Sequence, residues 1–228
     1  SCDHCNRAHQ MKVKTSYRLA TGPRPLVGHR TAAFKFVSIL VFWAIGMAIL
    51  PGISQAEDLN VPICYGFSCK TRVVISVTPA EWQSVVGWFS PSASSAADER
   101  QQIRKAIGWM EVIVGNHTPT YLDKGLNLEK NPQEKIGQMD CIDESKNTTT
   151  YLALFEQQGH LRWHRVLDPA YRRSMFDAHW AGQIQELKTS TAFVVDSWFQ
   201  DNGMLPYIRE SNVWKDLRWT ALVSPYRD

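Results

Sequence analysis

Three residues in the second half of this 228-residue chain have the types and order of a nucleophilic catalytic group. Cys141 lies where a helix is expected to begin, and His179 and Asp196 follow on segments expected to be neighbouring strands. A cysteine becomes a nucleophile when a nearby base takes its proton, and a histidine base needs an acceptor that fixes its tautomer. The pattern therefore predicts a Cys-His-Asp triad that attacks a carbonyl carbon.

The residues around Cys141 predict the start of a helix. Asp140 is a good N-cap, and Asp143 and Glu144 suit the first turn. A helix N-terminus lowers the pKa of a thiol and offers backbone N–H groups to an oxyanion, to which Gln138 could add a side-chain donor. Asp140 and Asp143 also flank the thiol, however, and their charges would raise its pKa.

The other elements follow from periodicity and turn residues. Strands are expected over 71–78, 161–167, 178–187 and 191–199, and helices over 79–89 and 98–116. Thr78 and Glu81 form a capping box, and the Pro- and Gly-containing segment 118–138 predicts a long ordered loop. A hairpin turn at 188–190 would place Asp196 opposite or diagonal to His179 on one face of the sheet.

These residues resemble a known superfamily. A helix-borne cysteine, then Ala178-His179-Trp180 on one strand and Val195-Asp196-Ser197-Trp198 on the next, is similar to the core of transglutaminase-like and papain-fold cysteine hydrolases. The resemblance covers about residues 98–200. It implies an α+β fold, with helices packed on one side of an antiparallel sheet and the helix of Cys141 central. It also implies Cys141 as nucleophile, His179 as base and Asp196 as the acid that orients the base. The chain is also similar to uncharacterised exported proteins of Gram-negative bacteria.

Residues 1–56 predict an export signal. They hold seven Lys and Arg but one acid, Asp3, and an uncharged apolar stretch over 36–50 precedes Pro51-Gly52. Ser54-Gln55-Ala56 places small residues where a signal peptidase reads, which predicts cleavage after Ala56 and a periplasmic or secreted protein. The alternative is an uncleaved membrane anchor, because extension to Ala56 would just reach the ~20 residues of a span.

The charge of the remaining chain argues against nucleic acid as a partner. The whole chain has 25 Lys and Arg and 22 Asp and Glu, so residues 57–228 carry 25−7 = 18 bases and 22−1 = 21 acids, a net charge of −3. A nucleic-acid surface needs clustered basic residues, which are missing from this part of the sequence. Residues 57–228 are expected to form one domain, with an N-terminal loop, strand and helix over 57–97 and the transglutaminase-like core over 98–228.

The cysteines outside the leader divide into a pair and a single residue. Cys64 and Cys69 lie five apart in a turn, which predicts a local disulfide in an oxidising compartment. Cys141 is the third of these cysteines, outside this predicted disulfide, which makes it a candidate nucleophile. No metal or other cofactor is predicted. His160 and His164 would lie ~13 Å apart on a strand, too far apart to bind one ion. The Cys2/Cys5 motif lacks a second pair of ligands, and it precedes Met11, a candidate start of the protein.

Two functions are compatible with these patterns. The first is an exported thiol-dependent acyl transferase or amide hydrolase that acts on a protein, a peptide or peptidoglycan. The second is a non-catalytic periplasmic binding or assembly module on the same fold, which the acids beside the thiol and the eight tryptophans of residues 57–228 favour.

Overall fold

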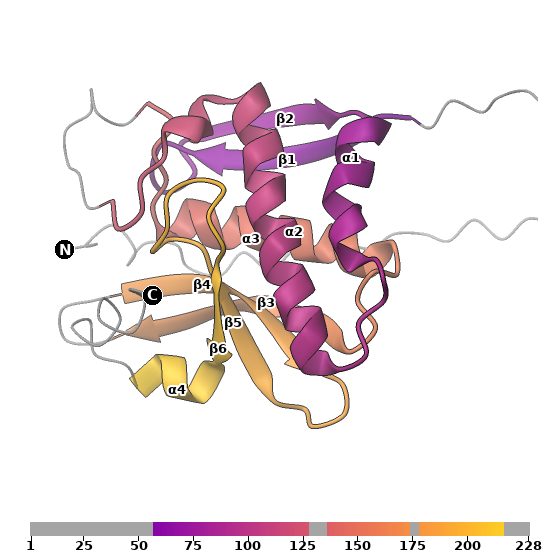
Figure 1. Ribbon diagram of the computed structural model, residues 1–228. Coiled ribbons are helices and arrows are strands. Elements are labelled where there is room, and N and C mark those ends of the chain that lie inside the picture. The colour runs from indigo at the N-terminus through magenta and orange to yellow at the C-terminus, as the bar shows by residue number, and fades with distance from the viewer. Residues whose placement is uncertain (1–56, 128–135, 174–177, 217–228) are drawn as a thin grey trace, which may run out of the picture. The chain divides into compact units, whose positions relative to one another are not determined.

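The computed structural model describes residues 57–127, 136–173 and 178–216 (Figure 1). The predicted signal peptide and its cleavage site at Ala56 lie outside the described residues. Within the described ranges, no helix combines the length and apolar character that a membrane span requires.

The described residues form an α+β domain with two antiparallel sheets, which confirms the predicted fold class at this level. One sheet pairs β1 (Leu59–Tyr65) with β2 (Thr71–Val77), and the other has the order β3-β4-β5-β6. The strands of the second sheet are β3 (His164–Arg173), β4 (Ala178–Glu186), β5 (Ala192–Asp196) and β6 (Tyr207–Glu210). The helices are α1 (Pro79–Val86), α2 (Ala96–His117), α3 (Cys141–Gln157) and α4 (Ser211–Asp216), with short 3-10 helices η2 (Gly87–Phe89) and η3 (Pro119–Leu122).

Side-chain caps fix where the helices begin. The capping box of Thr78 and Glu81 starts α1, as the sequence predicts. Helix α2 begins two residues before the predicted Asp98, because the hydroxyl of Ser95 accepts the Asp98 N–H at 3.1 Å. The α1 prediction was slightly long, since η2 tightens its last turn at Gly87–Phe89.

Helix α3 organises the core. It packs against β1 and against β3, β4 and β5, and Figure 1 shows it between the two sheets. Its residues Leu152 and Phe155 are fully buried, and the Phe155 ring lies 5.8 Å from that of Trp82 and 5.1 Å from that of Phe89. Burial of such apolar side chains is the main favourable term in folding, so α3 is fixed by contacts on both sides.

The two faces of the four-stranded sheet have different neighbours. Ile184, Phe193 and Val195 join the core formed with α2 and α3, whereas Ala181 and Val194 belong to a separate cluster with Trp214 of α4. The prediction that the helices pack on one side is therefore wrong for α4, because the chain returns after β6 to cover the second face. Strands β1 and β6 and helix α4 were not predicted.

Strand β3 differs from its predicted range at both ends. It continues through Asp168-Pro169, where the sequence suggested a polar crossing, and its pairing with β4 shifts between Leu167 and Ala170. A proline has no N–H for the ladder, and an irregularity at this point accommodates it. At its other end β3 begins at His164, because the N–H groups of Arg162 and Trp163 bond instead to Glu99.

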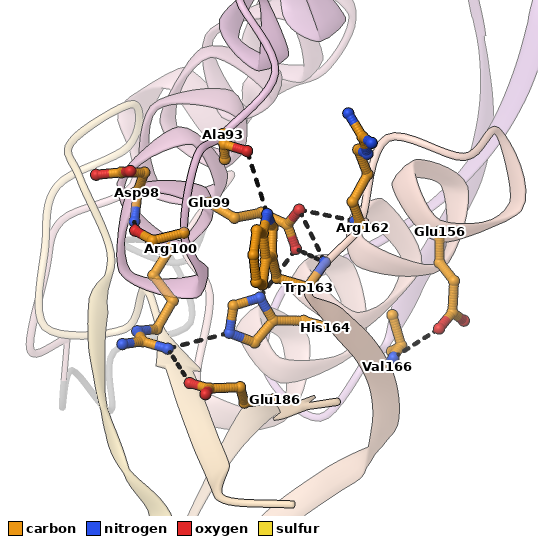
Figure 2. A network of polar contacts seen from close by, with 11 residues as sticks. Ala93, Asp98, Glu99, Arg100, Glu156, Arg162, Trp163, His164, Val166 and Glu186 are labelled. Carbon is orange, nitrogen blue, oxygen red and sulfur yellow. Dashed lines mark hydrogen bonds and ion pairs between the residues drawn. The ribbon is translucent and has the colours of Figure 1, made fainter. Parts of the chain in front are cut away.

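A buried polar network joins α2 to the start of β3 (Figure 2). The Glu99 carboxylate accepts the N–H of Arg162 at 2.7 Å, the N–H of Trp163 at 3.0 Å and Nδ1 of His164 at 2.9 Å. The other ring nitrogen of His164 lies 3.2 Å from Nη1 of Arg100, which also bonds Glu186 at 2.9 Å. Because an arginine only donates, Nε2 of His164 accepts and its Nδ1 carries the hydrogen that Glu99 receives.

The loss of Glu99 should destabilise the domain far more than the loss of Glu156, a more exposed glutamate that also accepts an N–H from β3. We expect Glu99→Ala to lower the free energy of unfolding by roughly 3 kcal/mol, because it leaves the buried ring of His164 and the partly buried N–H groups of Arg162 and Trp163 without this acceptor. Glu156→Ala is the matched control: Glu156 also accepts an N–H from β3, that of Val166 at 2.9 Å, but its side chain is exposed (Figure 2). Its removal should cost less than about 1 kcal/mol in denaturant unfolding. Equal losses in the two variants would contradict the assignment.

Candidate functional site

Cys141 is the first residue of α3, as the sequence predicts. Asp140 caps the helix: its Oδ1 accepts the N–H groups of Ile142 and Asp143 at 3.0 Å each, and Asp143 accepts the N–H of Asp140 in return. The sulfur of Cys141 lies 3.9 Å from the carbonyl oxygen of Ala178, the first residue of β4. The thiol is therefore held between a helix N-terminus and the start of the strand that carries His179.

His179 and Asp196 form a buried pair. Nε2 of His179 lies 2.8 Å from Oδ2 of Asp196, and both residues are about 1% exposed. The register Gly182↔Val195 makes the two residues diagonal neighbours on one face of the sheet, as expected from the hairpin. Since Nε2 is used by the carboxylate, Nδ1 is the ring nitrogen with which His179 would have to serve a nucleophile.

Aromatic rings enclose this pair. The imidazole of His179 lies 4.9 Å from Trp198, 5.3 Å from Phe199 and 5.5 Å from Trp214, measured between ring centroids. Nε1 of Trp214 donates to Oδ2 of Asp196 at 2.9 Å, the same oxygen that faces His179. Trp214 was not among the predicted site residues, because it reaches the pair only through α4, the helix that follows β6 in the chain. The local signal for Trp214 was its three-residue spacing from Ser211, which fits one buried face of a short helix.

Cys141 contacts β4 at its first residue, Ala178, which precedes His179 in the strand. Ala178 and Trp180 pack in the cluster of Cys141, and the imidazole of His179 contacts Trp214 of α4. Trp198 and Phe199 connect the two, because they belong to the Cys141 cluster and also contact the imidazole. The structure thus joins His179 to Asp196 and brings Cys141 beside the residue that precedes His179.

Gln138 is tied into the loop before α3. Its side-chain nitrogen donates to the carbonyl oxygen of Leu122, and its Oε1 accepts from the backbone N–H of Lys124 at 3.1 Å and from the side chain of Asn127. The residue is buried. The side-chain NH₂ of Gln138 has two hydrogens, and one of them bonds to Leu122. Only the other hydrogen could therefore be donated to an oxyanion, as the sequence predicts for Gln138.

The acids beside Cys141 are covered by the disulfide loop. Cys64 and Cys69 are bonded, with their Cα atoms 4.7 Å apart, in agreement with the sequence prediction. The carboxylates of Asp140 and Asp143 accept the backbone N–H groups of the loop residues 67–69. Burial, and then the charge of Asp140, raises the pKa of Asp143 to about 7, against the opposing effect of its N–H donors.

A second group of carboxyls is buried near α3. Burial raises the pKa of Glu111 to about 7 and that of Asp123 to about 8, and it raises the pKa of Glu144 well above its usual range. The charges of Glu111 and Asp123 further raise the pKa of Glu144. Burial therefore favours the protonated forms of these carboxyls, because it penalises their negative charges.

The histidines considered for metal binding have other partners. The His160 ring packs on Phe89 at 5.5 Å, and burial lowers its pKa. His164 is held by Glu99 and Arg100. Among the residues that the structure describes, no group of three or more His, Cys, Asp or Glu side chains could hold a metal ion.

Comparison with protein-family models, with curated proteins and with solved structures gives no match to this chain. The chemistry of the site is therefore argued from its own residues.

The buried carboxyls predict that stability falls as pH rises. A carboxyl whose folded-state pKa is raised binds a proton more tightly in the native than in the unfolded state, so its contribution is complete below about pH 4.5 and is lost as pH passes about 7. Glu111→Gln should remove part of this loss, on the order of 3 kcal/mol between pH 4.5 and pH 8, in urea unfolding at each pH. Glu81→Gln is the control, since the backbone N–H of Thr78 chiefly lowers the pKa of Glu81. Glu81→Gln should leave the decline of stability with pH as steep as in the wild type. The same steep decline in Glu111→Gln would show that Glu111 does not have a raised pKa in the folded protein.

Proposed function

We propose that this protein is an exported thiol-dependent acyl transferase or amide hydrolase, in which Cys141, His179 and Asp196 act together. The observation that carries the proposal is the buried His179–Asp196 pair, 2.8 Å apart, beside a cysteine at the N-terminus of a helix. This is the set of groups that nucleophilic catalysis by a thiol requires: a nucleophile, a base and an acid that orients the base. The resemblance to the papain and transglutaminase-like superfamily belongs to the same proposal.

Each group has one task in the reaction. His179 takes the thiol proton at Nδ1, and the sulfur of Cys141 bonds to the carbonyl carbon, which places the negative charge on the carbonyl oxygen. The backbone N–H of Cys141 and the side chain of Gln138 are the proposed donors to that oxygen. The C–N bond then breaks, the departing amine receives the proton from His179, and a thioester remains on Cys141. Water or a second amine attacks the thioester and releases the sulfur.

The enclosure of the site favours this chemistry once a substrate has entered. Trp198, Phe199 and Trp214 keep water away from the His179–Asp196 bond, and a low dielectric strengthens the interaction of the two groups. Substrates of the proposed class are a side-chain amide of a protein, a peptide bond or a peptidoglycan cross-link. Cys141 is about 1% exposed, so side chains of its cluster must move to admit any of them.

The burial of Cys141 also supports the second candidate, a binding or assembly module without catalysis. A hollow of about 210 Å³ lies away from Cys141, between Ala93, Ser94, Arg162 and Trp163. A cation and an indole are groups that bind ligands without chemistry. In this case Cys141→Ala leaves cellular function intact, whereas a change at Trp163 abolishes it.

The triad predicts that Cys141 reacts as an activated thiol. At pH 7, iodoacetamide should label Cys141 of the full chain faster than it labels N-acetylcysteine, as measured by mass spectrometry of the Cys141 peptide. His179→Ala should slow this labelling by roughly 10²-fold or more, because the thiol loses its base, and Asp196→Asn should slow it in the same direction. Cys141→Ser gives the background. Labelling no faster than that of the reference thiol, or unaffected by His179→Ala, would favour the binding module.

Trp214 predicts a separate effect through Asp196. Trp214→Phe keeps an aromatic ring but removes the donor to Oδ2 of Asp196, so we expect labelling of Cys141 to fall roughly tenfold, the effect of one hydrogen bond to a charged group. Trp109→Phe is the matched control, because Nε1 of Trp109 donates to Ser84 at the surface. It should leave the labelling rate unchanged. Equal rates in the two variants would show that Trp214 does not act through Asp196.

A further inference from the structure

The disulfide loop has a backbone conformation that is rare for residues with side chains. Gly66, Phe67, Ser68 and Cys69 have consecutive φ values of +82°, +67°, +56° and +57°. Glycine adopts such values readily, whereas the other three residues do so only where their surroundings maintain them. A run of this kind turns successive backbone N–H groups toward one side, which forms a concave surface that binds anions.

The anions that this loop binds are the two carboxylates beside Cys141. Oδ2 of Asp143 accepts the N–H of Phe67 at 2.8 Å, and its Oδ1 accepts the N–H of Cys69 at 2.5 Å. Oδ2 of Asp140 accepts the N–H of Ser68 at 2.8 Å. With the N–H groups of Asp140, Ile142 and Asp143 from α3 itself, six backbone donors converge on the two side chains.

Two further contacts hold the loop against α3. The side chain of Asn147 accepts the N–H of Cys64 and donates to its carbonyl oxygen, each at 2.8 Å. The N–H of Gly66 donates to the carbonyl oxygen of Gln138 at 2.8 Å. Since Asn147 lies on α3 and Gln138 precedes it, the loop is fixed to both sides of the residue that carries the thiol.

We propose that the Cys64–Cys69 loop activates Cys141, by using its backbone N–H groups to neutralise the negative charge of Asp140 and Asp143 that would otherwise oppose formation of the thiolate. The proposal rests on the function proposed above for Cys141. It resolves the conflict between a helix N-terminus, which favours a thiolate, and two neighbouring acids, which disfavour it. The disulfide holds the loop in a conformation that its three non-glycine residues would not adopt alone. The loop residues are thus positioning residues, since they act through the acids and not on a substrate.

The other titratable groups near this end of α3 are the same in all four members of the variant cycle that tests the proposal. They are His179 on β4, Asp196 on β5, Tyr207 on β6, Glu144 on α3 and Asp123, which accepts the N–H of Met139. A shift that depends on the loop and on Asp143 together can therefore be assigned to the loop and the acid.

The test is a four-variant cycle that measures the labelling of Cys141 by iodoacetamide between pH 5 and pH 10, on the full chain and by mass spectrometry. The plateau of the rate at high pH reports access to the thiol, and the pH at half of the plateau reports thiolate formation. We expect Cys64→Ala with Cys69→Ala to move the half-plateau pH upward by on the order of one unit. Addition of Asp143→Asn to that variant should reverse at least half of the shift, whereas Asp143→Asn alone should change it little.

Two single variants keep the test decisive if the double cysteine variant does not fold, as judged by near-ultraviolet circular dichroism. Phe67→Pro retains the disulfide but lacks one of the N–H donors and cannot adopt a positive φ, so it should give the same upward shift. Ser68→Gly retains its backbone N–H and fits the left-handed conformation, and it loses only the 3.3 Å contact of the Ser68 hydroxyl with Asp140, so its shift should be clearly smaller than that of Phe67→Pro. No shift in the cysteine and Phe67 variants, or a shift that Asp143→Asn does not reverse, overturns the proposal. A half-plateau pH that is the same in His179→Ala as in the wild type refutes the triad instead, whatever the loop variants show.

Discussion

The carboxylates of Asp140 and Asp143 are the point on which the site depends, because they must satisfy two requirements at once. Asp140 accepts the N–H groups of Ile142 and Asp143, which would otherwise be left without partners at a buried helix end, and Asp143 accepts the N–H of Asp140 in return. Both carboxylates also bring negative charge next to Cys141. The backbone donors of residues 67–69 allow both, since they bind the charge without adding a cationic side chain. The disulfide loop, the start of α3 and the thiol are therefore one structural unit, although more than 70 residues separate the loop from the cysteine.

His179, Asp196 and Trp214 form a second structural unit. His179 and Asp196 are held by a hairpin, and Trp214 closes them from the face that α4 covers. Trp198 and Phe199 contact both units, which makes them the physical link between the sulfur and the imidazole. The chemistry we propose depends on movement at this junction. Because the junction consists of aromatic side chains and not of charged pairs, its opening costs apolar burial but leaves the hydrogen bond of the His179–Asp196 pair in place.

Several carboxyl groups are buried in the domain, and they are accommodated in two different ways. Glu99 is satisfied by three donors from the start of β3, whereas Glu111, Asp123 and Glu144 retain protons because burial raises their pKa values. The first arrangement fixes where a strand begins. The second makes the stability of the domain depend on pH near neutrality, close to the helix that carries Cys141.

The sequence by itself determined the local features. Capping boxes at Thr78 and Asp140, the disulfide of Cys64 with Cys69 and the hairpin that pairs His179 with Asp196 follow from residue types at short separations, where the chain offers few alternatives. Only the tertiary structure decided which segments far apart in the chain would meet. The contact of residues 67–69 with Asp143, the position of Trp214 on Asp196 and the return of α4 to the second face of the sheet depend on long-range packing. The local sequence does not predict these partners, because a backbone N–H or an indole can donate to any acceptor that the fold brings near it.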